Sequence, residues 1–398
     1  MPSASSVRPS EPSDAATVVH RYAELDSLRG LAALTVIVGH FLNVWKTQPW
    51  WERFNTSPLR FIAAGHEAVV LFFLLSGFVL AIPFGKKSRP SYPEFMVRRV
   101  CRIYFPYVAA VILASAADQA LYSMTPTGNP WIDQTWNQPP SRSLILQHFL
   151  MIGHFDNAQL NTAFWSLVYE MRISIIYPLL YWASKRISAP VLLIGTFMAT
   201  IAAALCADKF GSEGFFYDFL YGGFFVVGII LQRHIAKLSH WFFVRSKIER
   251  GLLVALAIAC FDGPGALPSA KLFGSNLLPL YLADWTTLVG AVLILLLAIN
   301  LPTFRRFLHR PFFLRMGVIS YSAYLVHATV LFTFIRLCYG HAYFPWLFPL
   351  YILLTYLLSE IFHRLFEQPS TALGRKLGRR MHGAQLVVVS HAGGAAGE

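Results

Sequence analysis

The stretch LRGLAALTVIVGHFLNVW, residues 28–45, decides the fold class, because it is apolar over nearly a bilayer's thickness yet carries Arg29 and His40. These two residues are eleven positions apart, which makes about three helical turns. Both side chains therefore project from one helix face, about 16 Å apart. Ionisable residues inside a membrane are costly, which favours a function for the pair. The alternative is a snorkelling arginine and a histidine in a helix–helix hydrogen bond.

The composition extends this apolar character to the whole chain. Of 398 residues, 56% are hydrophobic and 13% are charged, and the mean hydropathy is +0.51. These values exclude a soluble globular domain and are typical of a polytopic helical membrane protein. We therefore expect an all-α fold with about ten transmembrane helices in one bundle. The expected spans are roughly 28–45, 62–84, 97–117, 163–183, 190–207, 215–232, 251–269, 278–300, 316–337 and 345–363.

Basic residues concentrate in alternate connections between these spans, for example in 86–102, 233–250 and 305–315. The positive-inside rule then predicts that both termini are cytoplasmic and that the protein spans the inner (plasma) membrane. The formal net charge of +13 faces an anionic inner leaflet in this topology, so no nucleic-acid partner is needed to explain it.

The two ends of the chain are predicted to lie outside the membrane domain. Residues 1–21 are rich in Ser, Pro and Ala and are expected to form a disordered cytoplasmic tail. Residues 370–398 are expected to form a basic or disordered cytoplasmic tail. The ten-span domain between them covers 22–369.

Two further arginines stand at the cytoplasmic start of the third span. Arg99 and Arg102 are at i,i+3 and share a helix face. Planar guanidinium groups suit phosphate oxygens, so a phosphate-bearing ligand at this inner mouth is one hypothesis. Ordinary anchoring by positive charge is the other.

A carboxylate and a polar stripe complete the candidate residues. Glu170 is expected about 10 Å inside the outer boundary, at a depth similar to that of His40. It is predicted either to orient the imidazole or to lock two helices together. In the ninth span, Ser320, Tyr324 and His327 follow at i, i+4 and i+7, a pattern typical of a helix-packing seam or of a ligand site.

Several familiar chemistries have no signature in the chain. The sequence contains no His-Glu-x-x-His zinc motif, no Gly-x-Ser-x-Gly elbow and no phosphate-binding P-loop. No histidine is followed five positions later by aspartate, so the His-x4-Asp pattern of glycerolipid acyltransferases is missing. No metal site is expected.

From about Tyr22 to Pro369 the sequence resembles the membrane acyltransferase-3 family, whose members O-acylate polysaccharides, lipids, antibiotics and cell-wall glycans. The resemblance begins with the Arg-x10-His signature at Arg29 and His40. Five more segments are similar in order and spacing: FFLLSGF at 72–78, Arg99-x-x-Arg102, WSLVYE at 165–170, ISYSAYLVH at 319–327 and FEQP at 366–369. One departure is that Met171 and Arg172 stand where relatives often carry a second glutamate, which argues against a mechanism that needs paired carboxylates.

The resemblance implies a reaction mechanism and a role in it for each candidate residue. Acyl-CoA, with acetyl-CoA expected, would be the donor substrate, and no bound cofactor is needed. Its phosphates would be held by Arg29, Arg99 and Arg102, and His40 would act as general base, with a covalent acyl-histidine as the lesser alternative. Glu170 is the candidate partner of the imidazole. The candidates for oxyanion or acceptor contacts are Ser76, Tyr324, His327, Trp131 and Trp136.

The acceptor is predicted to be a carbohydrate or a lipid hydroxyl. Trp131 and Trp136 lie in the longest extracytoplasmic connection, and exposed indoles suit sugar rings, although a membrane-interface aromatic belt gives the same pattern. The sequence leaves the oligomeric state unknown. The alternative function is a multi-span transporter of a glycan, lipid or acyl group, with helices broken at Gly222-Gly223 or Gly263-Pro264.

Overall fold

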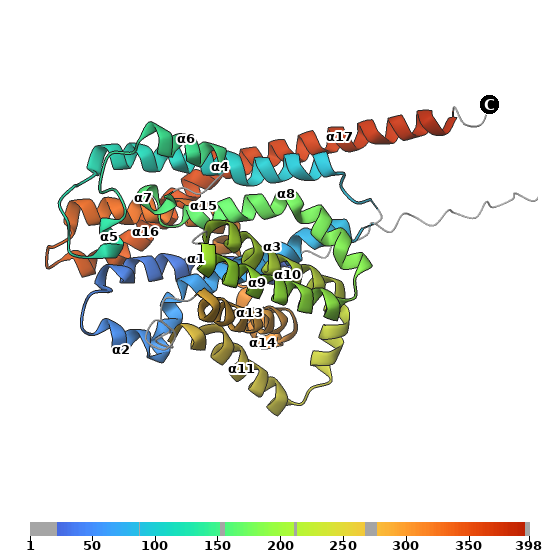
Figure 1. Ribbon diagram of the computed structural model, residues 1–398, viewed down its shortest axis with the longest axis horizontal. Helices are drawn as coiled ribbons and strands as arrows, with labels where there is room; N and C mark the ends of the chain where they lie inside the picture. Colours follow the sequence, from blue (N-terminus) through green and yellow to red (C-terminus); the bar gives the residue numbers. More distant parts are fainter. Residues whose placement is uncertain (1–21, 87, 152–155, 211–212, 267–276, 395–398) are drawn as a thin grey trace, which may run out of the picture.

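The computed structural model describes residues 22–86, 88–151, 156–210, 213–266 and 277–394. Over these residues the chain is helical and contains no strand, which confirms the all-α class. The long helices run side by side in one bundle (Figure 1). The predicted tail 1–21 lies outside the described residues.

Each predicted span corresponds to a helix. These helices are α1 (Ala23–Leu42), α3 (Gly65–Phe84), α4 (Tyr92–Leu121), α8 (Phe164–Arg186), α9 (Ala189–Phe210), α10 (Glu213–Phe243), α11 (Lys247–Ala266), α13 (Leu277–Asn300), α15 (Pro311–Cys338) and α16 (Phe348–Phe362).

Eight helical segments of the described chain are long and apolar enough to cross a membrane, which makes this an integral membrane protein. That number is lower than the ten predicted spans, because α8 and α11 are not among the eight. Both are long enough, at 23 and 20 residues. The interior of α8, however, carries Glu170 and Arg172, which lower its apolar character.

Short helices mark one end of the bundle. Trp51–Asn55 forms α2 and Pro130–Asp133 forms α5, and both lie at the left of Figure 1. The last helix, α17 (Gln368–Gly394), extends from the opposite end. We call these the α5 end and the α17 end. The remaining short elements are η1 (Asn43–Trp45), η2 (Pro58–Ala63), α6 (Arg142–Leu150), α7 (Asn157–Leu160), α14 (Pro302–Leu308), η3 (Phe344–Leu347) and η4 (His363–Glu367).

The C-terminal segment differs from its prediction. A basic or disordered tail was expected from residue 370, but α17 is a helix that lies along α4 (Figure 1), with Gly374 against Cys101. The residue just before α17, Glu367, is fixed to the bundle by a buried hydrogen bond of 2.7 Å that it accepts from Ser322. The first part of α17 therefore belongs to the fold.

Exposure separates the centre of the bundle from its surface. On α3, Val70, Leu74 and Leu75 are fully buried. On α9, by contrast, Val191 and Ile194 are 61% and 64% exposed. Apolar side chains exposed along a helix of this length are expected where lipid is the solvent, so α9 lies at the lipid-facing surface and α3 in the core.

Candidate active site

Two glycines bring α1 and α15 into backbone contact. A methyl group on Gly30 would lie 2.7 Å from the backbone nitrogen of Gly317, and one on Gly317 would lie 2.2 Å from the carbonyl oxygen of Asp26. No larger residue fits at either position, as is common where membrane helices pack closely. The face of α1 that carries Arg29 and His40 consequently lies against α15.

His40 lies towards the α5 end of this contact and is paired with a second histidine. Its Nδ1 atom is 3.0 Å from Nε2 of His327 and 3.4 Å from the hydroxyl oxygen of Thr162. Nδ1 of His327 is in turn 2.8 Å from the carbonyl oxygen of Tyr324. The sequence indicated His327 as part of a polar stripe, but the contact with His40 depends on how α1 and α15 pack and has no local sequence signal.

The two tryptophans that were predicted to contact the acceptor differ. Trp131 is partly exposed, and its ring centroid lies 5.8 Å from that of His40. Trp136 is fully buried, and its Nε1 donates a hydrogen bond of 3.0 Å to the carbonyl oxygen of Leu160. The expectation of an exposed indole at Trp136 is therefore wrong, because the connection folds this side chain inward.

A polar and aromatic cavity of about 540 Å³ opens beside His40. We call it the α5-side chamber. Its lining combines indoles with amides and hydroxyls, together with His66 and Lys46. The lining also includes His40, Thr162, Trp131, Trp165, Asn43 and Gln134.

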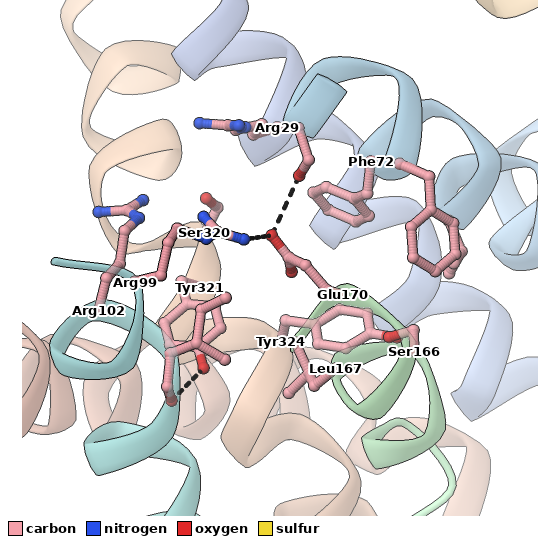
Figure 2. A pocket seen from close by; sticks show the side chains of 14 residues that line it. Arg29, Phe72, Arg99, Arg102, Ser166, Leu167, Glu170, Ser320, Tyr321 and Tyr324 are labelled. Atoms are coloured by element: carbon pink, nitrogen blue, oxygen red, sulfur yellow. Dashed lines mark hydrogen bonds and ion pairs between the residues drawn. The ribbon is translucent and has the colours of Figure 1, made fainter. Parts of the chain in front are cut away.

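Glu170 forms the centre of a second group, with Arg29, Arg99 and Tyr324 around it (Figure 2). Its Oε1 accepts a hydrogen bond of 2.8 Å from Nη2 of Arg99 and one of 3.1 Å from the hydroxyl of Ser76. Arg29 and Arg102 line the same pocket. The structure thus brings together all three arginines that the sequence singled out.

The predicted pairing of Glu170 with His40 is not present. The prediction assumed that α8 starts at the membrane surface, but Phe164 at its start is fully buried. Thr162, just before that start, already contacts His40. Glu170 lies eight residues further along the chain, about 12 Å deeper at 1.5 Å per residue. Glu170 is consequently at the level of Arg29, where it forms an ion pair with Arg99.

Arg29 and Arg102 have no ion-pair partner in direct contact among the described residues, although the carboxylates of Asp26 and Glu170 lie near enough to Arg29 to act on it electrostatically. Among the described residues, neither guanidinium group makes an ion pair or a hydrogen bond, whereas Arg99 is paired with Glu170. Arg29 is also partly buried. A poorly solvated cation without a partner is unfavourable, and an anionic ligand would compensate it.

The arginine pocket continues into a cavity of about 650 Å³ at the α17 end. The two share Arg29, Ser76, Arg99 and Arg102, and we call them together the α17-side chamber. Arg375 of α17 also lines the outer part. Arg375 was not among the predicted site residues, because residues 370–398 were expected to form a basic or disordered tail outside the membrane domain.

The two chambers meet at Tyr324. This residue lines both the arginine pocket and the α5-side chamber, as does Val69. The hydroxyl oxygens of Tyr324 and Ser166 are 2.7 Å apart. Among the candidates for oxyanion or acceptor contacts, Tyr324 lies between the chambers, whereas Ser76 donates a hydrogen bond to Glu170 on the arginine side. Ser320 also lines the arginine pocket.

A further charged network borders the α5-side chamber. His66 and the buried Asp284 are in contact, with Nε2 and Oδ1 2.7 Å apart. Arg60 forms ion pairs with both Glu67 and Asp262. These contacts connect η2 and α3 to α11 and α13, so the network fixes one wall of the chamber.

A family model for an acyltransferase domain matches residues 22–364, which contain nearly all of both chambers. The chain belongs to the acyltransferase-3 family. This match confirms the resemblance that the sequence motifs indicated, and it makes the protein a membrane-embedded acyltransferase.

Two curated proteins are similar to this acyltransferase-3 chain. "Acyltransferase MdmB" from Streptomyces mycarofaciens is 27% identical over 350 residues, which are 81% of each chain. "Protein 2 in picA locus" from Rhizobium radiobacter is 28% identical over 198 residues, which are 47% of this chain and 96% of the relative. No solved structure gives a significant match.

Proposed function

We propose that this acyltransferase moves an acyl group from acyl-CoA to a hydroxyl of a carbohydrate or lipid acceptor in the cell envelope, with acetyl-CoA as the expected donor. The observation that carries the proposal is that one face of α1 presents Arg29 to one chamber and His40 to another, and that the chambers meet at Tyr324. Such an arrangement suits two substrates that enter from opposite ends.

The donor would bind in the α17-side chamber. The guanidinium groups of Arg29 and Arg102, which have no direct ion pair, suit the phosphates of coenzyme A, and Arg375 adds a cation at the outer rim. The flexible thiol arm of coenzyme A would then run along α1 towards Tyr324. The separation of about 16 Å between the levels of Arg29 and His40 is compatible with that reach.

The reaction would take place beside His40. The acceptor hydroxyl transfers its proton to His40 while its oxygen attacks the thioester carbon. The carbon–sulfur bond then breaks, and the thiolate receives that proton. Tyr324 is the proposed hydrogen-bond donor to the oxyanion, because it lies between the chambers. Glu170 balances the charge of Arg99 rather than acting on His40.

The acceptor would bind in the α5-side chamber. Trp131 lies against His40 and offers an indole face for a sugar ring, and Asn43 and Gln134 offer amide groups for its hydroxyls. A carbohydrate or glycosylated hydroxyl therefore fits this lining better than an acyl chain does.

The orientation of the protein follows from its charges. Arg98, Arg99, Arg102 and Arg375 gather at the α17 end, which the positive-inside rule assigns to the cytoplasm. The α5-side chamber would then open to the outer side of the inner membrane.

Release of coenzyme A thiol tests this function. Purified membranes that contain the protein are supplied with acetyl-CoA, with or without envelope glycan, and the free thiol is measured. We expect release that the glycan stimulates and that membranes without the protein do not show. Glycan uptake by vesicles without thiol release would instead support the transporter.

A further inference from the structure

We propose that His327 is a positioning residue that holds His40 in one tautomer, so that the lone pair of His40 Nε2 faces the α5-side chamber. The inference rests on the proposed function, because it explains how His40 is prepared to act as a base. It is derived from the geometry of three consecutive hydrogen-bond partners.

The position of the ring proton of His327 follows from its backbone contacts. Its Nδ1 lies 2.8 Å from the carbonyl oxygen of Tyr324 and 3.2 Å from that of Ala323. A carbonyl oxygen only accepts hydrogen bonds, so Nδ1 of His327 must carry a proton and donate it. An unprotonated Nδ1 at this distance would place two lone pairs against each other.

Nε2 of His327 is a hydrogen-bond acceptor. The side chain is fully buried, and its hydrogen-bond contacts among the described residues are two carbonyl oxygens and the imidazole of His40, with no carboxylate. A buried histidine without a counterion is neutral, because charging it carries a large desolvation cost. A neutral imidazole with its proton on Nδ1 has a lone pair on Nε2, which can only accept.

This acceptor in turn determines the tautomer of His40. Its Nδ1 is 3.0 Å from Nε2 of His327, which can only accept, so Nδ1 of His40 must be the donor. Thr162 reinforces the arrangement, because its hydroxyl oxygen is 3.4 Å from the same nitrogen and can accept part of the bond. In the neutral imidazole of His40 the remaining nitrogen, Nε2, is then unprotonated, and no described residue hydrogen-bonds to it. His40 is partly exposed and lines the chamber.

This arrangement resembles the catalytic triad of a hydrolase, in which one group orients the imidazole that acts as base. Here a histidine takes the place of the carboxylate. Because a neutral acceptor replaces a charged one, His40 is fixed in orientation without an additional charge in the membrane. Glu170 is not needed for this purpose, which agrees with its distance from His40.

Three substitutions of His327 test the proposal in the full-length protein in native membranes. In His327→Gln, the amide oxygen reaches far enough to accept the hydrogen bond from Nδ1 of His40. His327→Asn carries the same amide on a shorter side chain that does not reach, and His327→Met fills a similar volume without a strong acceptor. Thiol release from acetyl-CoA with envelope glycan is measured, and kcat and KM for acetyl-CoA are compared with those of the parent.

We expect kcat to fall by about 100-fold or more in His327→Asn and His327→Met, because the tautomer of His40 is no longer fixed. We expect His327→Gln to stay within about 10-fold of the parent. KM for acetyl-CoA should remain unchanged in all three. Size-exclusion elution in detergent checks that each variant is folded.

Two results would overturn the proposal while leaving His40 as the base. One is a folded His327→Met variant with the kcat of the parent, and the other is an equal loss in the Gln and Met variants. A fully active His40→Ala variant would instead remove the proposed function, and the role of His327 with it.

Discussion

Replacing His40 with alanine is expected to lower kcat for acyl transfer by about 10²–10⁴-fold, the range typical of the loss of a general base. His40 is the imidazole beside the point where the two chambers meet, and no other described histidine hydrogen-bonds to it except His327. Binding of acetyl-CoA should remain at the level of the parent, because Arg29 is about 16 Å away along α1 and Arg99 and Arg102 line the same pocket as Arg29. Thiol release and acetyl-CoA binding are measured on the same membranes.

His148→Ala is the matched control for that variant. His148 is buried and its Nδ1 lies 2.7 Å from the hydroxyl oxygen of Tyr107, but it lines neither chamber. We expect this control to lose thermal stability and to keep its activity per folded molecule. Equal losses of activity in the two variants would contradict a special role for His40.

Replacing Arg29 with glutamine is expected to raise KM for acetyl-CoA by about 10–100-fold, which corresponds to one or two charge-assisted hydrogen bonds to phosphate. The stability of the protein should not fall, because Arg29 has no ion pair to lose among the described residues. Removing a half-buried cation without a partner is expected to be neutral or stabilising. Kinetics and thermal unfolding of the same preparation give both quantities.

Arg99→Gln provides the contrast. It leaves Glu170 as a mostly buried carboxylate without its partner, and breaking such a pair costs about 3–5 kcal/mol of folding free energy. This variant should therefore lose stability as well as donor affinity. An Arg29→Gln protein that is destabilised as strongly as Arg99→Gln, with an unchanged KM, would show that Arg29 is structural.

The relative positions of residues on the same helix could be predicted from the sequence. Arg29 and His40 share a face of α1 because of helical periodicity, and Arg99 and Arg102 do so on α4. The apolar composition indicated the all-α membrane class, because each transmembrane span must form its own backbone hydrogen bonds within the bilayer. The partners across helices were harder to predict.

The errors arose where the depth or path of a segment depends on tertiary packing. Glu170 was placed beside His40 on the assumption that α8 begins at the surface, whereas Asn161 and Thr162 before it are already buried. Trp136 was expected to be exposed, but it adopts a positive φ of 55° and points inward. No local pattern indicates such a backbone conformation at a tryptophan, because it is rare outside glycine.

The central claim is that the acyl group passes between chambers that open at opposite ends of the bundle. Sealed inside-out membrane vesicles with envelope glycan trapped in the lumen test it most directly, with acetyl-CoA labelled in the acetyl group added outside. We expect label on the glycan inside, free coenzyme A outside, and neither with His40→Ala. Label on glycan only when donor and acceptor share one side, or intact acetyl-CoA in the lumen, would contradict the account.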